Sequence, residues 1–257
     1  MKKHGRRFRA NNSGQLLIVA ALAVAVLISS TTIYVYELSK ETNSEASLSI
    51  SDFIFSIKQS TKNAVISSLA NVSNGGEAAV LITNLDEFSR VLRSLTQFGI
   101  CQLDFTVFND SMYNSGIWLS WDASDIGVSS VYTNFTFKVY GAAANTTMNY
   151  DVNITTAVTV NGYFNRLVGD EKLVNLTLRA YNEGEPALAQ NIAIYYESLG
   201  SWTPVSSSNN LSILDYGNGT YIATFTVDVP SDSLPVSVHV NDLRGIFVQA
   251  NTTCYEP

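Results

Sequence analysis

The chain has 257 residues, 46% of them hydrophobic, and a formal net charge of −7. Five basic residues precede a long apolar stretch, whereas ten basic and all 22 acidic residues follow it, so the part after the stretch carries a formal net charge of −12. A strongly acidic surface repels nucleic acid, which excludes nucleic-acid binding as a function. About 220 residues remain after the stretch, enough for one or two domains with a real core.

The apolar stretch, residues 14–36, reads GQLLIVAALAVAVLISSTTIYVY and contains no charged residue. As a helix, residues 16–36 would be about 30 Å long, enough to cross the hydrocarbon core of a bilayer. We therefore predict a transmembrane helix over residues 15–36. By the positive-inside rule, the basic leader, residues 1–14, stays in the cytoplasm and the C-terminal part is extracellular.

A cleaved secretory signal ending near Ser29 and Ser30 is the main alternative. The uncharged run continues past this point to Tyr34 and Tyr36. Tyrosines at the end of an apolar run are typical of a membrane interface, which favours a retained anchor.

Nine Asn-x-Ser/Thr sequons follow the anchor, more than the roughly four expected from this composition by chance. They predict glycosylation on an exported protein, although β-rich surface proteins also favour Asn and Thr for other reasons. The nine are Asn71, Asn109, Asn134, Asn145, Asn153, Asn175, Asn210, Asn218 and Asn251.

The two cysteines, Cys101 and Cys254, both lie in the part predicted to be exported. An even number of cysteines in an oxidising compartment predicts one disulfide between them. Two buried free thiols are the alternative. Neither cysteine has a histidine nearby in sequence that would indicate a catalytic or metal-binding role.

No glycine or proline interrupts residues 15–74, so one long helix can leave the membrane. We predict a helical stalk over residues 37–100, broken at Asn74-Gly75-Gly76 and resuming over residues 77–98. The apolar stripe of the second helix comprises Val80, Leu81, Leu85, Phe88, Val91, Leu92 and Leu95.

From Cys101 onward the hydrophobic period changes to two, which indicates half-buried strands. The short alternating segments with turn signals between them predict a β-sandwich, and hence an α+β chain. The predicted strands are residues 101–107, 117–121, 131–140, 151–160, 173–181, 191–197, 220–229, 235–241 and 246–251.

The run at residues 215–221, DYGNGTY, is followed by IATFTV. It resembles a turn and strand of immunoglobulin-like domains in prokaryotic surface proteins, in which the Gly-x-Tyr places a tyrosine at a corner. The resemblance implies an immunoglobulin-like sandwich over residues 150–257, preceded by a β-rich segment over residues 101–149. The module lacks an internal cysteine pair, and Trp202 is its only tryptophan. The resemblance does not identify a ligand.

A short basic leader, then Gly14-Gln15, then a long apolar helix running into a β-rich head resembles an archaeal type IV pilin-like protein. The resemblance implies cleavage between Gly14 and Gln15 by a class III signal peptidase. Ser13 stands where that family usually has a basic residue, and Val19 stands where its filament-forming members carry an assembly glutamate.

One short segment is a candidate ligand patch. Two tryptophans could stack on sugar rings while two aspartates bind polar groups or calcium, although packing in the core and shaping a turn is the alternative role. His239 lies on the polar phase of a strand and is interpreted as a surface residue. The patch comprises Trp118, Trp121, Asp122 and Asp125.

No set of residues identifies a reaction, a cofactor or a metal site, so we expect a non-enzymatic surface protein. Its expected role is structural or adhesive, as a pilin-like subunit or an envelope-associated binding module. Expected partners are the membrane, other pilin-like or envelope proteins and surface glycans. Two alternatives stay open: a monomeric anchored adhesin, favoured by Val19, and an exported enzyme acting on surface polysaccharide.

Overall fold

The computed structural model describes residues 50–95, 99–141 and 145–257. The chain divides into two units, Met1–Phe55 and Ser56–Pro257. The first unit is described only at residues 50–55, and the second is described except at residues 96–98 and 142–144. The leader, the predicted transmembrane helix over residues 15–36 and the start of the predicted stalk lie outside the described residues. Among the helices that are described, none is both long enough and apolar enough to span a bilayer.

Two helices precede the strands, α2 (Ile50–Ser73) and α3 (Val80–Ser94). The predicted break between them is confirmed, and Gly75 has a φ of 98°, in the left-handed region that favours glycine. The Asn84 amide donates to Ser68 Oγ at 3.0 Å and joins the two helices. Of the predicted stripe on α3, Leu81, Leu85 and Leu92 are buried, whereas Val91 and Leu95 are exposed.

The strands form two antiparallel sheets. Sheet A has the order β1-β3-β4-β5-β10-β9, with β2 also pairing with β3 and β6 with β5, and sheet B has the order β12-β11-β7-β8. Sheet A contains β1 (Ile100–Val107), β2 (Ile117–Ser120), β3 (Ile126–Tyr140), β4 (Asn145–Arg166), β5 (Glu171–Asn182), β6 (Glu185–Pro186), β9 (Ser212–Asp215) and β10 (Thr220–Asp228). Sheet B contains β7 (Ala189–Ser198), β8 (Ser201–Pro204), β11 (Leu234–Asp242) and β12 (Phe247–Cys254).

Every strand predicted from period-two alternation is present, and the predicted β-sandwich is confirmed. The prediction missed β6, β8 and β9, which have only two to four residues each and give too short a pattern to recognise. A short 3₁₀ turn, η1 (Ser207–Asn209), lies between β8 and β9.

Strand β4 is continuous through Tyr150, where the sequence suggested a boundary between a β-rich segment and the sandwich. Its first part pairs with β3 and its later part with β5. The residues on both sides of position 150 therefore belong to one sheet.

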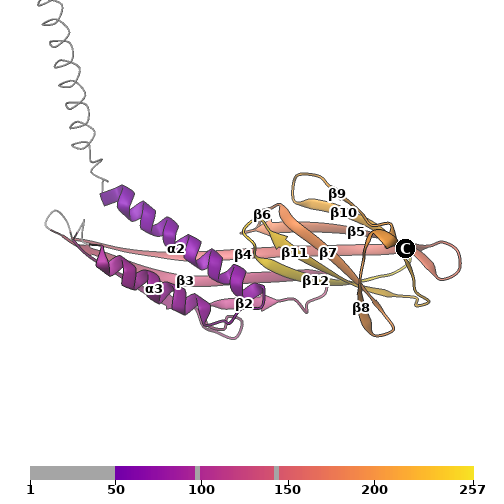
Figure 1. Cartoon of the computed structure of the whole chain (residues 1–257), viewed down its shortest axis with the longest axis horizontal. Coiled ribbons are helices and arrows are strands. Elements are labelled where there is room, and N and C mark those ends of the chain that lie inside the picture. The colour runs from indigo at the N-terminus through magenta and orange to yellow at the C-terminus, as the bar shows by residue number, and fades with distance from the viewer. Residues whose placement is uncertain (1–49, 96–98, 142–144) are drawn as a thin grey trace, which may run out of the picture. The chain divides into compact units, whose positions relative to one another are not determined.

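Two different layers cover the same face of sheet A, which we call the inner face (Figure 1). Tyr150 of β4 bonds to Thr61 of α2 through the two hydroxyls at 3.0 Å. Further along β4, Val158 and Val160 are buried in the core shared with sheet B. All three β4 residues have even numbers, so they point to one side of the strand. The helices therefore cover the first part of the inner face, and sheet B covers the second.

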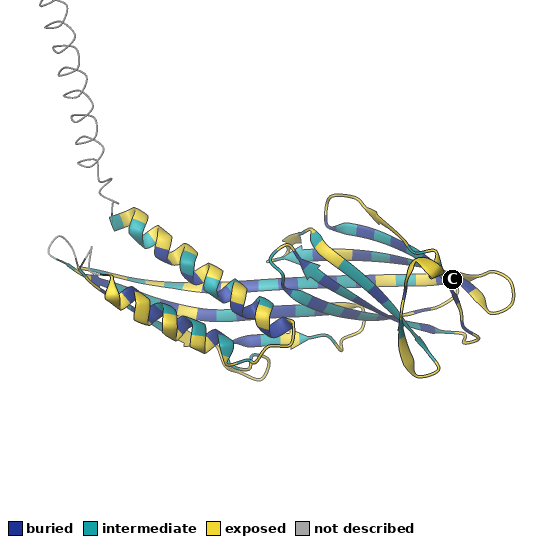
Figure 2. Ribbon diagram, viewed as in Figure 1, coloured by how far each residue is buried: buried dark blue, intermediate teal, exposed yellow. Residues whose placement is uncertain are grey.

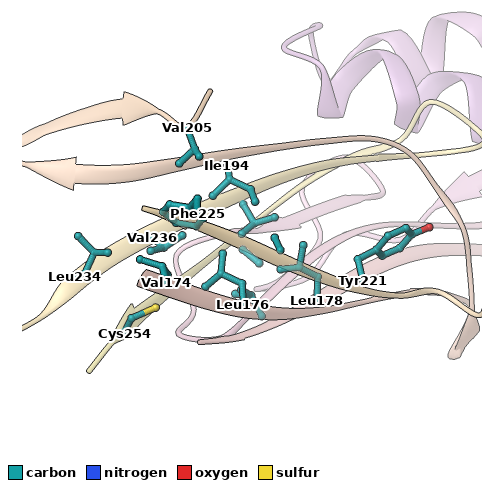
Figure 3. Packing of buried hydrophobic residues seen from close by; sticks show 14 of the residues in the cluster. Val174, Leu176, Leu178, Ile194, Val205, Tyr221, Phe225, Leu234, Val236 and Cys254 are labelled. Carbon is teal, nitrogen blue, oxygen red and sulfur yellow. The ribbon is translucent and has the colours of Figure 1, made fainter. Parts of the chain in front are cut away.

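The main core lies between β4, β5 and β10 on one side and sheet B on the other. Its side chains include Leu176, Phe225 and Val236, none of them exposed (Figure 3). Tyr221, at the start of β10, is also buried, and its hydroxyl accepts a hydrogen bond from Ala189 N–H at 2.8 Å. The tyrosine predicted at a corner thus joins the first residue of β7 in sheet B to β10 in sheet A.

The predicted disulfide between Cys101 and Cys254 is wrong, because both residues are buried free thiols. Cys101 pairs with Val139, which in turn pairs with Thr146 of β4. Cys254 Sγ instead lies 2.7 Å from the position that a Cβ would take on Gly162, far along the same strand. About 50 Å of strand separates Thr146 from Gly162, whereas a disulfide requires Cα atoms within about 7 Å.

Candidate functional site

The predicted ligand patch of Trp118, Trp121, Asp122 and Asp125 is divided between two faces. Trp121 Nε1 donates to Ser129 Oγ at 3.1 Å, and its ring meets Phe247 edge to face at 5.1 Å. Asp125 accepts a hydrogen bond from Thr252 Oγ1. These bonds tie Trp121 and Asp125 to β12, so both perform a structural task, while Asp122 is exposed.

Trp118 lies instead on the outer face of sheet A, the face opposite the helices and sheet B. It pairs with Ser130, which is itself buried but lies at an even position on β3, on the side opposite to the odd positions such as Val131 and Phe135. Its ring belongs to a group that we call the outer aromatic cluster. The ring centroids are 5.9 Å apart for Tyr113 and Trp118, 5.5 Å for Phe108 and Tyr113, and 5.3 Å for Phe108 and Tyr132.

A chain of hydroxyl groups connects this cluster to a sequon. Tyr113 Oη lies 3.0 Å from Ser130 Oγ, and Ser130 Oγ lies 2.8 Å from Thr155 Oγ1. Thr155 Oγ1 donates in turn to Asn153 Oδ1 at 3.5 Å, and Thr155 N–H donates to Glu183 Oε1 at 3.1 Å. Asn153 and Thr155 are the first and third residues of one sequon, so its two polar side chains are held in a defined arrangement.

The sequons differ in how accessible they are. Asn175 and Asn251 are half-buried, and the Asn251 amide donates to Trp121 O at 3.0 Å, a bond that a glycan on that nitrogen would have to break. Asn134 and Asn153 are exposed on the polar side of β3 and β4. The exposed sequons are Asn71, Asn109, Asn134, Asn145, Asn153, Asn210 and Asn218.

His239 is half-buried between two rings on sheet B. Its centroid lies 4.6 Å from that of Tyr195 and 5.3 Å from that of Phe247. Burial lowers the pKa of its imidazole, which favours the neutral form. Its role here is packing, and no hydrogen bond to a nucleophile accompanies it among the described residues.

A buried ion pair sits where α2, β4 and sheet B meet. The Asp242 side chain is fully buried and accepts hydrogen bonds from Arg244 Nε at 2.7 Å and from Thr156 Oγ1 at 3.0 Å. Arg244 also donates to Glu183 at 2.7 Å. Burial alone would lower the pKa of Arg244, but its hydrogen bonds to the two carboxylates outweigh burial and raise it. We call Asp242, Arg244, Thr156 and Glu183 the junction network.

The end of α2 is attached at the same place. Asn74 Nδ2 donates to Gly245 O at 2.9 Å, and Phe247 N–H donates to Ser73 Oγ at 3.0 Å. The turn between β11 and β12 therefore holds both the junction network and the C-terminus of the helix.

A pocket with a volume of about 660 Å³ lies at the far end of the sandwich. It is lined by Val168, Gly169, Asp170, Glu171, Tyr196, Ser208, Asn209, Thr226, Val227 and Asp228. Beneath this end, the buried Lys172 donates to Val229 O and lies over the Phe164 ring at 5.2 Å. Burial, and next the nearby positive charge of Arg166, lower the pKa of Lys172. No group of three or more metal-ligating side chains occurs within residues 50–95, 99–141 and 145–257.

Sequence reasoning missed the outer aromatic cluster and the junction network. Phe108 is brought to Tyr132 where the pairing of β1 with β3 ends, and Tyr113 reaches them from the loop between β1 and β2, neither of which periodicity reveals. The Asp-Leu-Arg-Gly turn at residues 242–245 did carry a local signal, since Asp often begins a turn and glycine often ends one.

The described chain thus defines a β-sandwich protein whose long first sheet also carries two helices. Comparison with known proteins adds no relative: no protein-family model, no curated protein and no solved structure matches the chain. Its function must therefore be argued from its own residues.

Proposed function

We propose that the chain is a single-pass surface protein with a structural or adhesive role. The basic leader lies in the cytoplasm, residues 15–36 cross the membrane, and the unit Ser56–Pro257 lies outside the cell. The observation that carries the proposal is the order of charge and hydropathy: five basic residues, an uncharged stretch, then a part with a net charge of −12.

The polar outer face of sheet A supports an extracellular location. Seven of the nine sequon asparagines are exposed, and Asn134 and Asn153 lie at exposed positions of β3 and β4. Figure 2 shows how exposed and half-buried residues alternate with buried ones along the strands. A surface of this kind is suited to water and to glycans.

The strand order supports an immunoglobulin-like module. Its two sheets have the orders β4-β5-β10-β9 and β12-β11-β7-β8. These correspond to the ABED and GFC sheets of that fold, with β8 in the place of an added C′ strand. Such folds host many functions, so the correspondence supports the architecture and names no ligand.

The pilin-like reading and the monomeric adhesin share this placement and differ in assembly. In the pilin-like alternative, the apolar helix proposed for residues 15–36 packs laterally against other subunits in a filament. Val19 supports the monomer, because the carboxylate that filament-forming pilins use is absent from that position.

The enzyme alternative required a pocket in which two carboxylates gather with Trp118 or Trp121. Neither tryptophan lines the 660 Å³ pocket, and neither lines a further pocket near Pro230. No observation favours that alternative over a surface module.

Protease treatment of intact cells of the native host tests the proposed location. We expect peptides from residues 56–257 to be released from intact cells, while a cytoplasmic protein measured in parallel stays intact. Release of these peptides only after lysis would contradict the proposal.

A further inference from the structure

One sequon on the outer face has an aromatic ring directly opposite it. Asn153 of β4 pairs with Tyr132 of β3. Tyr132 N–H donates to Gly116 O at 2.9 Å, and Tyr132 O accepts from Phe108 N–H at 3.1 Å. Both backbone groups of Tyr132 thus point away from β4, which makes Tyr132 and Asn153 a non-hydrogen-bonded pair. In such pairs the Cα atoms are about 4.5 Å apart and the side chains are closest.

The Asn153 side chain is held without using its nitrogen. Its Oδ1 accepts a hydrogen bond from Thr155 Oγ1, whereas Nδ2 has no hydrogen-bond partner among the described residues. The residue is exposed, so Nδ2 is open to modification. Asn251 is the opposite case, because its Nδ2 is bound to Trp121 O.

The tyrosine is equally well fixed. The Tyr132 ring packs against Phe108 at 5.3 Å in the outer aromatic cluster. An aromatic surface that is already ordered can bind the apolar C–H face of a sugar without further loss of side-chain entropy.

The same pairing recurs in sheet A. Asn145 pairs with Tyr140 of β3, and Asn175 pairs with Tyr163 of β4. Asn153 is the best placed of the three. Asn175 is half-buried, and Asn145 lies at the first position of its strand, where no described residue supplies a chain of hydroxyl groups to orient it.

From these contacts we infer that Asn153 is N-glycosylated and that its first sugar residue packs on Tyr132. The donor is a sugar bound through a phosphate ester to a lipid. The Asn153 Nδ2–C1 bond forms, the bond from C1 to the phosphate oxygen breaks, and the proton lost from Nδ2 is taken up by the departing phosphate. The inference rests on the extracellular location proposed above.

Glycopeptide mass spectrometry of the full chain from its native host gives the first test. We expect a glycan on Asn153. An Asn153 without glycan overturns the inference. If some of the other eight sequons carry glycans, only this inference fails. If all nine are without glycan, the glycosylated surface proposed above loses its support as well. The protease experiment on intact cells decides the location independently.

A double-mutant cycle tests the contact with Tyr132. In the glycosylated full chain, we expect Asn153→Gln to lower the unfolding temperature by about 2–4 °C when Tyr132 is present. In the Tyr132→Thr background the same substitution should lower it by less than half as much. An equal loss in both backgrounds would overturn the packing of sugar on tyrosine.

Asn218→Gln is the matched control, because Asn218 is an exposed sequon in a turn with no strand opposite it. Its effect should be the same with and without Tyr132. The four chains of the cycle are also measured without glycans, produced in a host that lacks the transferase. There the two substitutions should act independently, and coupling that persists without glycan would contradict the inference.

Discussion

The two parts of sheet A's inner face are covered by different layers, and comparing them shows how one continuous sheet can pack against helices and against a second sheet. Over the first part, the buried leucines of α3 and residues of α2 such as Val65 form the cover. Over the second part, sheet B contributes residues such as Val236 and Val238. Strand β4 passes under both layers without interruption. We therefore expect the two parts to unfold together, with the turn between β11 and β12, which carries Asp242 and Arg244 of the junction network and also binds the end of α2, as the connection between the layers.

Neutralising the buried carboxylate of the junction network should have the largest effect. Asp242→Asn leaves the Arg244 guanidinium without its buried counter-charge, which should lower the free energy of unfolding by about 3–5 kcal/mol. Glu183→Gln is the matched control. It removes the other carboxylate on the same arginine, but that side chain is 43% exposed, and we expect a loss of at most about 1 kcal/mol. Denaturant unfolding of both variants measures the difference, and equal losses would contradict the role given to Asp242.

Two matched leucines compare the two layers directly. Leu85 of α3 and Leu176 of β5 are both fully buried, so Leu85→Ala and Leu176→Ala should each lower the free energy of unfolding by about 2–5 kcal/mol. Because both layers pack on β4, far-ultraviolet circular dichroism, which follows the helices, and tryptophan fluorescence, which follows tertiary packing, should show the same unfolding transition in each variant. A separate early loss of helix in Leu85→Ala would show that the layers unfold independently.

His239 should make stability weakly dependent on pH. Burial lowers its pKa below the ordinary value of 6.5, so the folded chain binds fewer protons than the unfolded chain as the pH falls through that value. Stability contributed by the neutral ring is therefore complete above pH 6.5 and decreases below it. Thermal unfolding at pH 7.5 and pH 5 should show a smaller decrease for His239→Gln than for the unchanged chain. An identical decrease would exclude a contribution from His239.

A reducing agent should have no effect on the unfolding temperature, because no disulfide joins the two layers. Burial raises the pKa of the Cys101 thiol, and burial together with the charge of Asp125 raises that of Cys254 to about 12. Both thiols should resist alkylation at neutral pH in the folded chain and react after unfolding. Mass spectrometry after alkylation checks this prediction. If the two unfolded cysteines react only after reduction, the chain does contain the disulfide.

The sequence was informative wherever structure is set by local periodicity. The alternation of Phe135, Phe137 and Val139 with polar residues correctly predicted which side of β3 is buried. The glycines after Asn74 correctly predicted the end of α2. These features depend on neighbouring residues, which a sequence displays directly.

Features that depend on which strands become neighbours were not predictable in the same way. The count of two cysteines suggested a disulfide, but Cys101 of β1 lies near one end of β4 and Cys254 of β12 lies beside Gly162 near its other end. Trp118 and Trp121 are three residues apart, so strand alternation alone places them on opposite faces. Their partners, Tyr113 and Phe247, depend on the fold and were not predictable. The pairing of Tyr132 with Asn153 likewise requires the register of β3 and β4, which the sequence does not give.

The N-terminus of the mature protein, isolated from the membranes of its native host and identified by mass spectrometry, tests the proposed anchor most directly. We expect a terminus at or before Gln15, so that the apolar stretch stays attached to the head. A terminus at Gln15 itself would further support pilin-like processing, whereas an intact Met1 would favour the monomeric anchored adhesin. A terminus beyond Ser30 would show that the stretch is a cleaved signal peptide and would contradict the proposed membrane anchor.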